Sequence, residues 1–147
     1  MDMKGFFAFE GLTDFERMTF VSACKNVELP EDEAIVTQGE RMDGLYFVTD
    51  GGLRVHVEAG AMEQELALMA APCLVGELEL FVDAPVAATV TTIERVSALV
   101  MPYAAFRQRL ADNDLATYKI VLNLAGLLAN RLHAADRRVG EISRHTS

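Results

Sequence analysis

The feature that most constrains the fold is a series of short apolar segments, each ended by turn residues. Their limits are 34–37, 45–49, 53–58, 66–69, 88–92 and 97–101. The second and third alternate apolar with polar side chains, as β-strands do, and Asp50-Gly51-Gly52 between them favours a tight hairpin with positive φ. Short strands in this number must hide their edges. The sequence therefore predicts a mainly β protein with flanking helices, in which a jelly-roll β-barrel (a double-stranded β-helix) spans residues 29–101.

Helices are predicted at both ends of this β region. Thr13 and Glu16 form a Thr-x-x-Glu capping box, which predicts an N-terminal helix over residues 13–25. Pro102 is a favourable first residue for a short helix over 103–110, and the Asp-Asn-Asp sequence at 112–114 can cap a long helix that ends near residue 142. The C-terminal helices thus span 102–142. A chain of 147 residues, 51% of them hydrophobic, is long enough for one core, so we expect a single domain over residues 1–147.

The long C-terminal helix carries apolar residues around too much of its circumference to bury only one face. This distribution indicates that one side packs on the β region and the other on a second copy of the chain. The sequence therefore predicts a homodimer whose seam includes Tyr118, Leu122, Ala125, Leu128, Ala129 and Leu132.

Composition excludes several classes of protein. The formal net charge of -9 argues against a nucleic-acid partner, because phosphates demand a basic surface. Cys24 and Cys73 have no C-x-x-C spacing, so reduced thiols and a cytoplasmic location are expected. No run of about 18 apolar residues predicts a membrane span.

Residues 75–90 read VGELELFVDAPVAATV, and they carry the functional signal. They resemble the F-G-E-x-A-L-x(4)-P-R-A-A-T cassette of cyclic-nucleotide-binding domains, the family of catabolite activator proteins and protein kinase A regulatory subunits. The order of Gln38-Gly39, Tyr46-Phe47 and Gly51 upstream is also similar to that family. The resemblance implies the jelly roll, a ribose ligand at Glu77, and a cradle of backbone N–H groups for the cyclic phosphate. The implied ligand-binding residues are Gly76, Glu77, Leu78, Val86, Ala87, Ala88 and Thr89.

The cassette departs from the family where charge matters most. The family's phosphate-binding arginine should stand at position 86, where this chain has Val86, and the small residue after G-E-x is Glu79. Residues 55–94 contain no Lys or Arg. A phosphodiester that leaves water needs charge-assisted hydrogen bonds, and a second carboxylate repels it. We therefore expect a non-catalytic regulatory module with no cofactor, in which cyclic-nucleotide binding is disfavoured and the pocket is closed by apolar packing. A small uncharged or cationic ligand is a further alternative.

A second hypothesis keeps the receptor function. Arg131, Arg137 or Arg138 on the terminal helix of a dimer mate would supply the missing cation. The stretch from Arg131 to Gly140 is similar to R-L-x-x-T-S-x-K-V-G of catabolite activator proteins, with Ala135 and Asp136 in place of the Thr-Ser pair that contacts adenine. Because the sequence ends at Ser147, where such proteins enter a winged helix-turn-helix, it resembles a sensor whose output is carried by a protein partner.

A third hypothesis is a metal-dependent cupin enzyme, because cupins share the jelly roll and use His and Glu ligands. His56 and Glu58 are the candidates. The chain has three histidines in all, and open metal sites generally need three protein ligands. We therefore expect His56 to be a surface residue of a strand and predict no metal site. No nucleophile motif or P-loop indicates a catalytic residue either.

Overall fold

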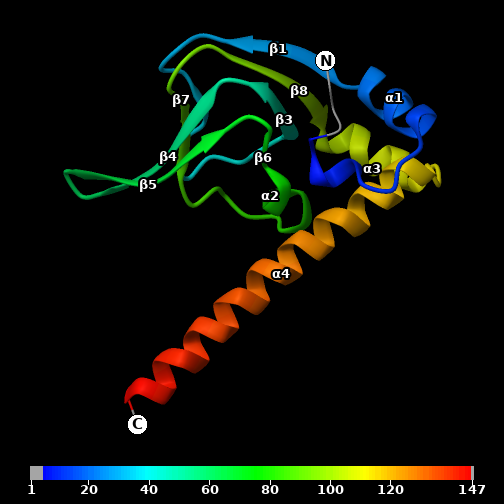
Figure 1. Cartoon of the computed structure of the whole chain (residues 1–147). Coiled ribbons are helices and arrows are strands. Elements are labelled where there is room, and N and C mark those ends of the chain that lie inside the picture. Colours follow the sequence, from blue (N-terminus) through cyan, green and yellow to red (C-terminus); the bar gives the residue numbers. More distant parts are fainter. Residues whose placement is uncertain (1–4, 147) are drawn as a thin grey trace.

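The computed structural model describes residues 5–146, with side chains for 5–140. Within them, two antiparallel sheets of four strands face each other (Figure 1). One sheet has the order β1-β8-β3-β6 and the other β2-β7-β4-β5. The strands are β1 (Lys25–Leu29), β2 (Ala34–Val36), β3 (Gly44–Asp50), β4 (Gly52–Ala59), β5 (Met62–Ala70), β6 (Cys73–Val75), β7 (Thr89–Thr92) and β8 (Val96–Pro102). The jelly roll is confirmed, although its sheets form an open sandwich rather than a closed barrel.

The first strand lies where the sequence predicted the end of a helix. Helix α1 (Asp14–Ser22) ends three residues early, and β1 starts at Lys25, so the β region begins before residue 29. β1 pairs with β8, which lies about 70 residues further along the chain, and this pairing gives Val27 and Leu29 an apolar surface to cover. The sequence around β1 gives no indication of a pairing strand so far along the chain.

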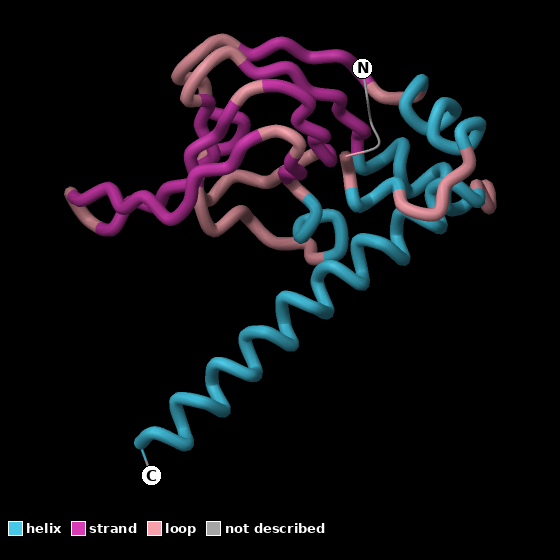
Figure 2. The backbone as a smooth tube through the Cα atoms, in the orientation of Figure 1, coloured by secondary structure: helices cyan, strands magenta, loops and turns pink. Residues whose placement is uncertain are grey.

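The remaining helices are η1 (Phe7–Phe9), α2 (Glu77–Phe81), α3 (Tyr103–Ala111) and α4 (Leu115–Thr146), shown in Figure 2 as cyan tube. The predicted capping box is present: Thr13 Oγ1 accepts from the Glu16 backbone, and Glu16 accepts from the Thr13 backbone. Asp114 caps α4 by accepting from the backbone N–H of Thr117 at 3.1 Å. Two of the three predicted helices therefore begin at the caps that the sequence indicated.

The structure has two hydrophobic cores. The aromatic core joins β3 and β8 to η1, α1, α3 and α4, and five of its members are Phe6, Phe9, Phe20, Phe47 and Phe106. The inter-sheet core lies between the two sheets and consists of Val36, Val48, Leu53, Val75, Val86, Val90, Val96 and Ala98. The cassette contributes Val75, Val86 and Val90 to the second core and Leu80 to the first, whereas the base of α4 belongs to the first alone.

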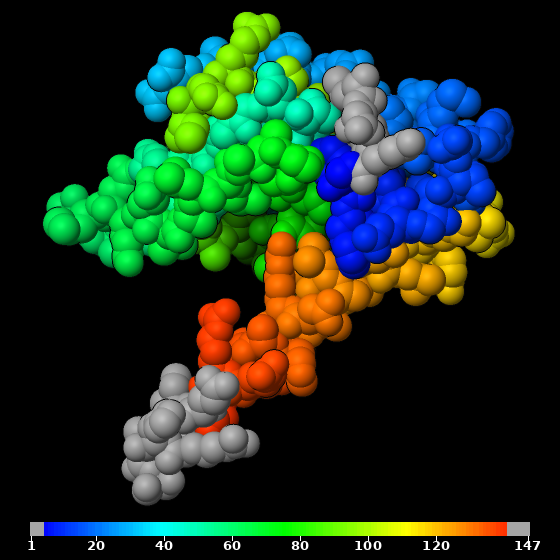
Figure 3. All heavy atoms as spheres, in the orientation of Figure 1, coloured from blue at the N-terminus to red at the C-terminus, as the bar shows by residue number. Residues whose placement is uncertain are grey.

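Helix α4 is held mainly by its first turns, and Arg131 adds a hydrogen bond to Glu77 of α2 further along. Ala116, Thr117, Ile120 and Leu124 are buried, and the Asn123 amide donates to the carbonyls of Ala8 and Glu10. The C-terminal part of the helix extends away from the sheets (Figure 3). No helix among the described residues is long and apolar enough to cross a membrane. Five of the predicted seam residues are exposed and the sixth, Leu128, is half-buried.

Candidate functional site

The cassette begins with a backbone conformation that only glycine adopts easily. Gly76 has φ of 92° and precedes α2 directly. A Cβ atom there would lie 2.6 Å from the Gly44 carbonyl oxygen and 2.8 Å from the Tyr103 hydroxyl. That hydroxyl donates to the carbonyl of Gly76. The left-handed φ and this contact turn the chain so that Glu77 and Glu79 emerge from β6 on a short helix.

The other arm of the cassette is held by the loop after β2. The Val86 backbone N–H donates to the Glu40 carbonyl at 2.8 Å, and the Val86 carbonyl accepts from the Gly39 N–H at 3.0 Å. Thr89 Oγ1 accepts from the backbone N–H of Gln38 at 2.9 Å. Position 86 is thus fixed by its backbone, while its side chain, 6% exposed, faces the interior.

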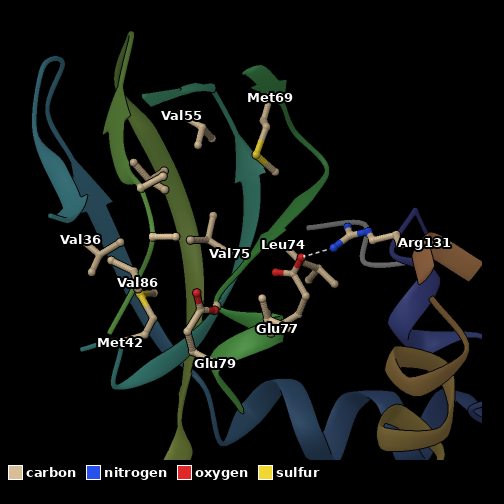
Figure 4. Close-up of a pocket in the computed structure, with 15 residues that line it drawn as sticks. Val36, Met42, Val55, Met69, Leu74, Val75, Glu77, Glu79, Val86 and Arg131 are labelled. Carbon is tan, nitrogen blue, oxygen red and sulfur yellow. Dashed lines mark hydrogen bonds and ion pairs between the residues drawn. The ribbon is translucent and has the colours of Figure 1, made fainter. Parts of the chain in front are cut away.

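Between these arms lies an open cavity of about 240 Å³ (Figure 4). The expectation of a pocket closed by apolar packing was wrong: Val86 forms part of one wall without filling the space. Six of the seven predicted ligand-binding residues line the cavity, namely Gly76, Glu77, Leu78, Val86, Ala87 and Ala88. Thr89 does not line it, because its hydroxyl is directed to Gln38.

The structure brings a cation to the cavity that local sequence analysis did not place there. Arg131 of α4 lines the cavity from the same chain, and its Nη1 donates to Glu77 Oε1 at 2.8 Å. The Glu77 side chain is 13% exposed and that of Arg131 56% exposed. The second hypothesis named Arg131 but placed it on a partner subunit, whereas the described contact is within one chain. Arg137 and Arg138 do not line the cavity.

Glu79 is the second carboxylate of the cavity. In Figure 4 it lies at the cavity on the opposite side of Glu77 from Arg131. Among the described side chains, none forms a hydrogen bond or ion pair with Glu79, whereas Glu77 has Arg131. Among residues 5–140, the charged residues that line the cavity are therefore two carboxylates and one guanidinium, which is already paired.

The charges of Glu77 and Glu79 shift the pKa values of neighbouring side chains. Burial raises the pKa of the Tyr103 phenol well above its usual value, and the charges of Glu79 and Glu77 raise it further. Burial and then the charge of Glu77 raise the pKa of Cys73 to about 11. Both groups stay protonated at neutral pH, so the nearby Cys73 thiol is not an anionic nucleophile.

His56 is buried, contrary to the expectation of a surface residue. It is 8% exposed because the flanking strands β5 and β7 cover it: its Nε2 lies 3.0 Å from Thr91 Oγ1, and its Nδ1 lies 3.0 Å from Glu63 Oε1 without hydrogen-bond alignment. Glu58, the other cupin candidate, does not join this cluster. Among the described residues, no group of three His, Cys, Asp or Glu side chains is arranged to hold a metal ion.

Comparison with known proteins identifies the family. The model of the cyclic nucleotide-binding domain matches residues 26–113. The chain belongs to this family. The cyclic AMP receptor protein of Thermus thermophilus is 30% identical over 145 residues, 96% of this chain and 64% of that protein. A CRP-like cAMP-activated global transcriptional regulator of Mycobacterium tuberculosis is 26% identical over 135 residues, 91% of this chain and 58% of that protein. The crystal structure of Thermus thermophilus catabolite activator protein has a TM-score of 0.81 and 27% identity, covering 94% of this chain and 63% of that one.

The family resemblance and the jelly roll are thereby confirmed, and the relatives are regulators by name. The chain spans less than two thirds of the length of these relatives. One of them is named a cyclic AMP receptor and another a cAMP-activated transcriptional regulator. The comparisons therefore lend no support to the expectation that nucleic acid plays no part. The roles of Val86 and of the other cassette residues, and the dimer seam, stay predictions.

Proposed function

We propose that this chain forms a non-catalytic, cytoplasmic regulatory module of the cyclic-nucleotide-binding family whose cassette does not bind cyclic AMP or cyclic GMP tightly. Its α4 mediates a homodimer that docks a partner protein. Residues 1–147 do not contact nucleic acid in this proposal, since their net charge of -9 would repel phosphates.

One observation carries the proposal: the cassette lines an open cavity in which no described side chain supplies an unpaired cation. Val86 stands where the family's phosphate-binding arginine is expected, Glu79 adds a carboxylate, and Arg131 is hydrogen-bonded to Glu77. A cyclic phosphate in this cavity would lose its hydration without gaining a bidentate cation. Removal of one partner of a buried charge pair costs about 3–5 kcal/mol. We therefore expect affinity at least roughly 10²-fold below that of a cassette with arginine.

Isothermal calorimetry with cyclic AMP and cyclic GMP tests this point. The proposal predicts no saturable heat at micromolar nucleotide. Low-micromolar affinity for either nucleotide would refute it.

The exposed guanidinium of Arg131 favours one alternative, a true cyclic-nucleotide receptor. If the nucleotide ribose took the place of Arg131 on Glu77, the guanidinium would be free to approach the phosphate. In that case Arg131→Ala abolishes cyclic AMP binding, and Arg138→Ala, which alters a cation that does not line the cavity, leaves it intact. Equal weak binding by the wild type and both variants excludes this receptor.

The seam of the proposed dimer follows from the exposed face of α4. Tyr118, Leu122, Ala125, Ala129 and Leu132 are separated alternately by four and three residues, the spacing that lines up side chains for a two-helix coiled coil. Leu122 is 54% exposed and Leu132 64% exposed. Leu128 is half-buried and lies outside this spacing, so we place it at the margin of the seam.

Light scattering tests the dimer. The wild type should have twice the mass of one chain, and Leu122→Glu should shift it to the monomer or to aggregates because it places charge in the seam. Ala134→Glu adds the same charge to an exposed position on another face of the helix and should leave the dimer intact. A monomeric wild type would contradict the proposal.

A further inference from the structure

The cavity at the cassette is apolar on most of its surface. Its walls come from both sheets and include Val36, Val55, Met69, Leu74 and Val90. A cavity of about 150 Å³ with such walls accepts a benzene ring, and this one measures about 240 Å³. A ring or branched alkyl group with a short polar arm therefore fits its size and its walls.

The polar end of the cavity is negative. Glu77 is already paired with Arg131, so the carboxylate of Glu79 is the charge left without a partner among the described side chains. Figure 4 shows it below the apolar walls, between Met42 and Glu77. The described residues that line the cavity carry two negative charges and one positive charge.

We infer that the cavity binds a small organic cation, with an apolar body between the sheets and a protonated amine against Glu79. This inference rests on the proposed function, because it requires that no cation of the cassette serves an anionic ligand. An ammonium group would restore neutrality and donate charge-assisted hydrogen bonds to Glu79. A neutral ligand leaves the carboxylate unpaired, and an anionic ligand adds like charge.

The neighbouring groups support this preference for positive charge. The pKa of Tyr103, which lies beside Gly76, is raised mainly by burial and then by the charges of Glu79 and Glu77. The Tyr103 hydroxyl is also engaged with the Gly76 carbonyl and does not compensate Glu79.

Three probes that share a phenylethyl group and differ in charge distinguish the effect of charge from that of shape. They are phenethylamine, 2-phenylethanol and 3-phenylpropanoate. At neutral pH they are a cation, a neutral molecule and an anion. In calorimetric or ligand-observed NMR titrations of the full chain, the amine should bind about tenfold tighter than the alcohol. The carboxylate should bind more weakly than the alcohol.

Glu79→Gln keeps the shape and removes the charge, so the amine and the alcohol should then bind alike. Glu58→Gln is the matched control: it changes the net charge equally at an exposed residue that does not line the cavity, and the amine should keep its advantage. Arg131→Gln releases Glu77 and should strengthen amine binding.

Equal affinity for the three probes, an amine preference that survives Glu79→Gln, or no binding by any probe would each overturn the inference. These results are distinct from a failure of the proposed function, which shows as tight binding of cyclic AMP by the wild type. If neither the nucleotide nor the amine binds, the proposed function stands and only this inference fails.

Discussion

The two hydrophobic cores differ in how completely their side chains fill space. In the aromatic core, Phe47 contacts the rings of Phe6, Phe9 and Phe20, with ring centroids 5.1–5.9 Å apart. The inter-sheet core consists mostly of valines and borders a cavity of about 240 Å³. The aromatic core packs the helices against the sheets, whereas the inter-sheet core borders a cavity with room for a ligand. Stability and binding are thus assigned to separate regions of one small domain.

The largest expected effect is in the aromatic core. Phe47→Ala should lower the free energy of unfolding by about 3–5 kcal/mol, because it leaves a void among fully buried rings. Val86→Ala in the cavity wall should cost roughly 1–2 kcal/mol, since fewer atoms are removed and part of the side chain already faces empty space. Urea unfolding measures both. Equal costs would mean that the two cores are packed alike.

The junction between the cores should be the next most sensitive place. Gly76→Ala should cost on the order of 3 kcal/mol, because its left-handed φ and the Gly44 carbonyl 2.6 Å from the new Cβ both oppose a side chain. Gly60→Ala is the control: φ is 67°, nothing lies within 4 Å, and we expect about 1 kcal/mol from backbone strain alone. If the two variants unfold at the same urea concentration, the close contact at Gly76 has no energetic weight.

A smaller effect concerns the cap that seats α4 on the aromatic core. Asp114→Ala should cost about 1 kcal/mol at neutral pH by removing the hydrogen bonds to Thr117. Partial burial alone would raise the pKa of Asp114, but the hydrogen bonds from Thr117 and the charge of Arg109 outweigh it and lower that pKa. A depressed pKa in the folded state stabilises the protein above the unfolded-state pKa of about 3.9.

That contribution is lost as the pH falls through the folded-state pKa. The stability difference between the wild type and Asp114→Ala should therefore be constant near neutral pH and shrink below about pH 4. Urea titrations over a pH series measure it. A difference that grows on acidification would contradict the assignment of the lowered pKa to the cap.

Sequence patterns were sufficient wherever the determining residues are close together in the chain. The Thr13 capping box, the positive φ of Gly51 and the cassette all depend on neighbours within a few residues. The hairpin predicted at Asp50-Gly51-Gly52 was wrong, because β3 pairs with β6 and β8 whereas β4 pairs with β5 and β7, so the turn joins strands of different sheets. Sequence patterns failed where the interacting residues are far apart in the chain. Strand β1 forms by pairing with β8, and Glu77 forms its hydrogen bond with Arg131, which lies 54 residues further along. His56 was misplaced for the same reason, because β5 and β7 cover it from either side. The volume of the cavity depends on many side chains from distant parts of the chain, so no local sequence pattern predicts it.

The central claim is that the cassette lines an open cavity that lacks an unpaired cation among the described side chains and therefore does not bind a cyclic nucleotide tightly. Calorimetry of the double variant Val86→Arg with Glu79→Ala tests it most directly, with Val86→Met and Glu79→Ala as the control of similar length and no charge. The account predicts that cyclic AMP binding appears, with at least about 100-fold higher affinity in the arginine variant than in the wild type or the control. A well-folded arginine variant that gains no affinity would contradict it.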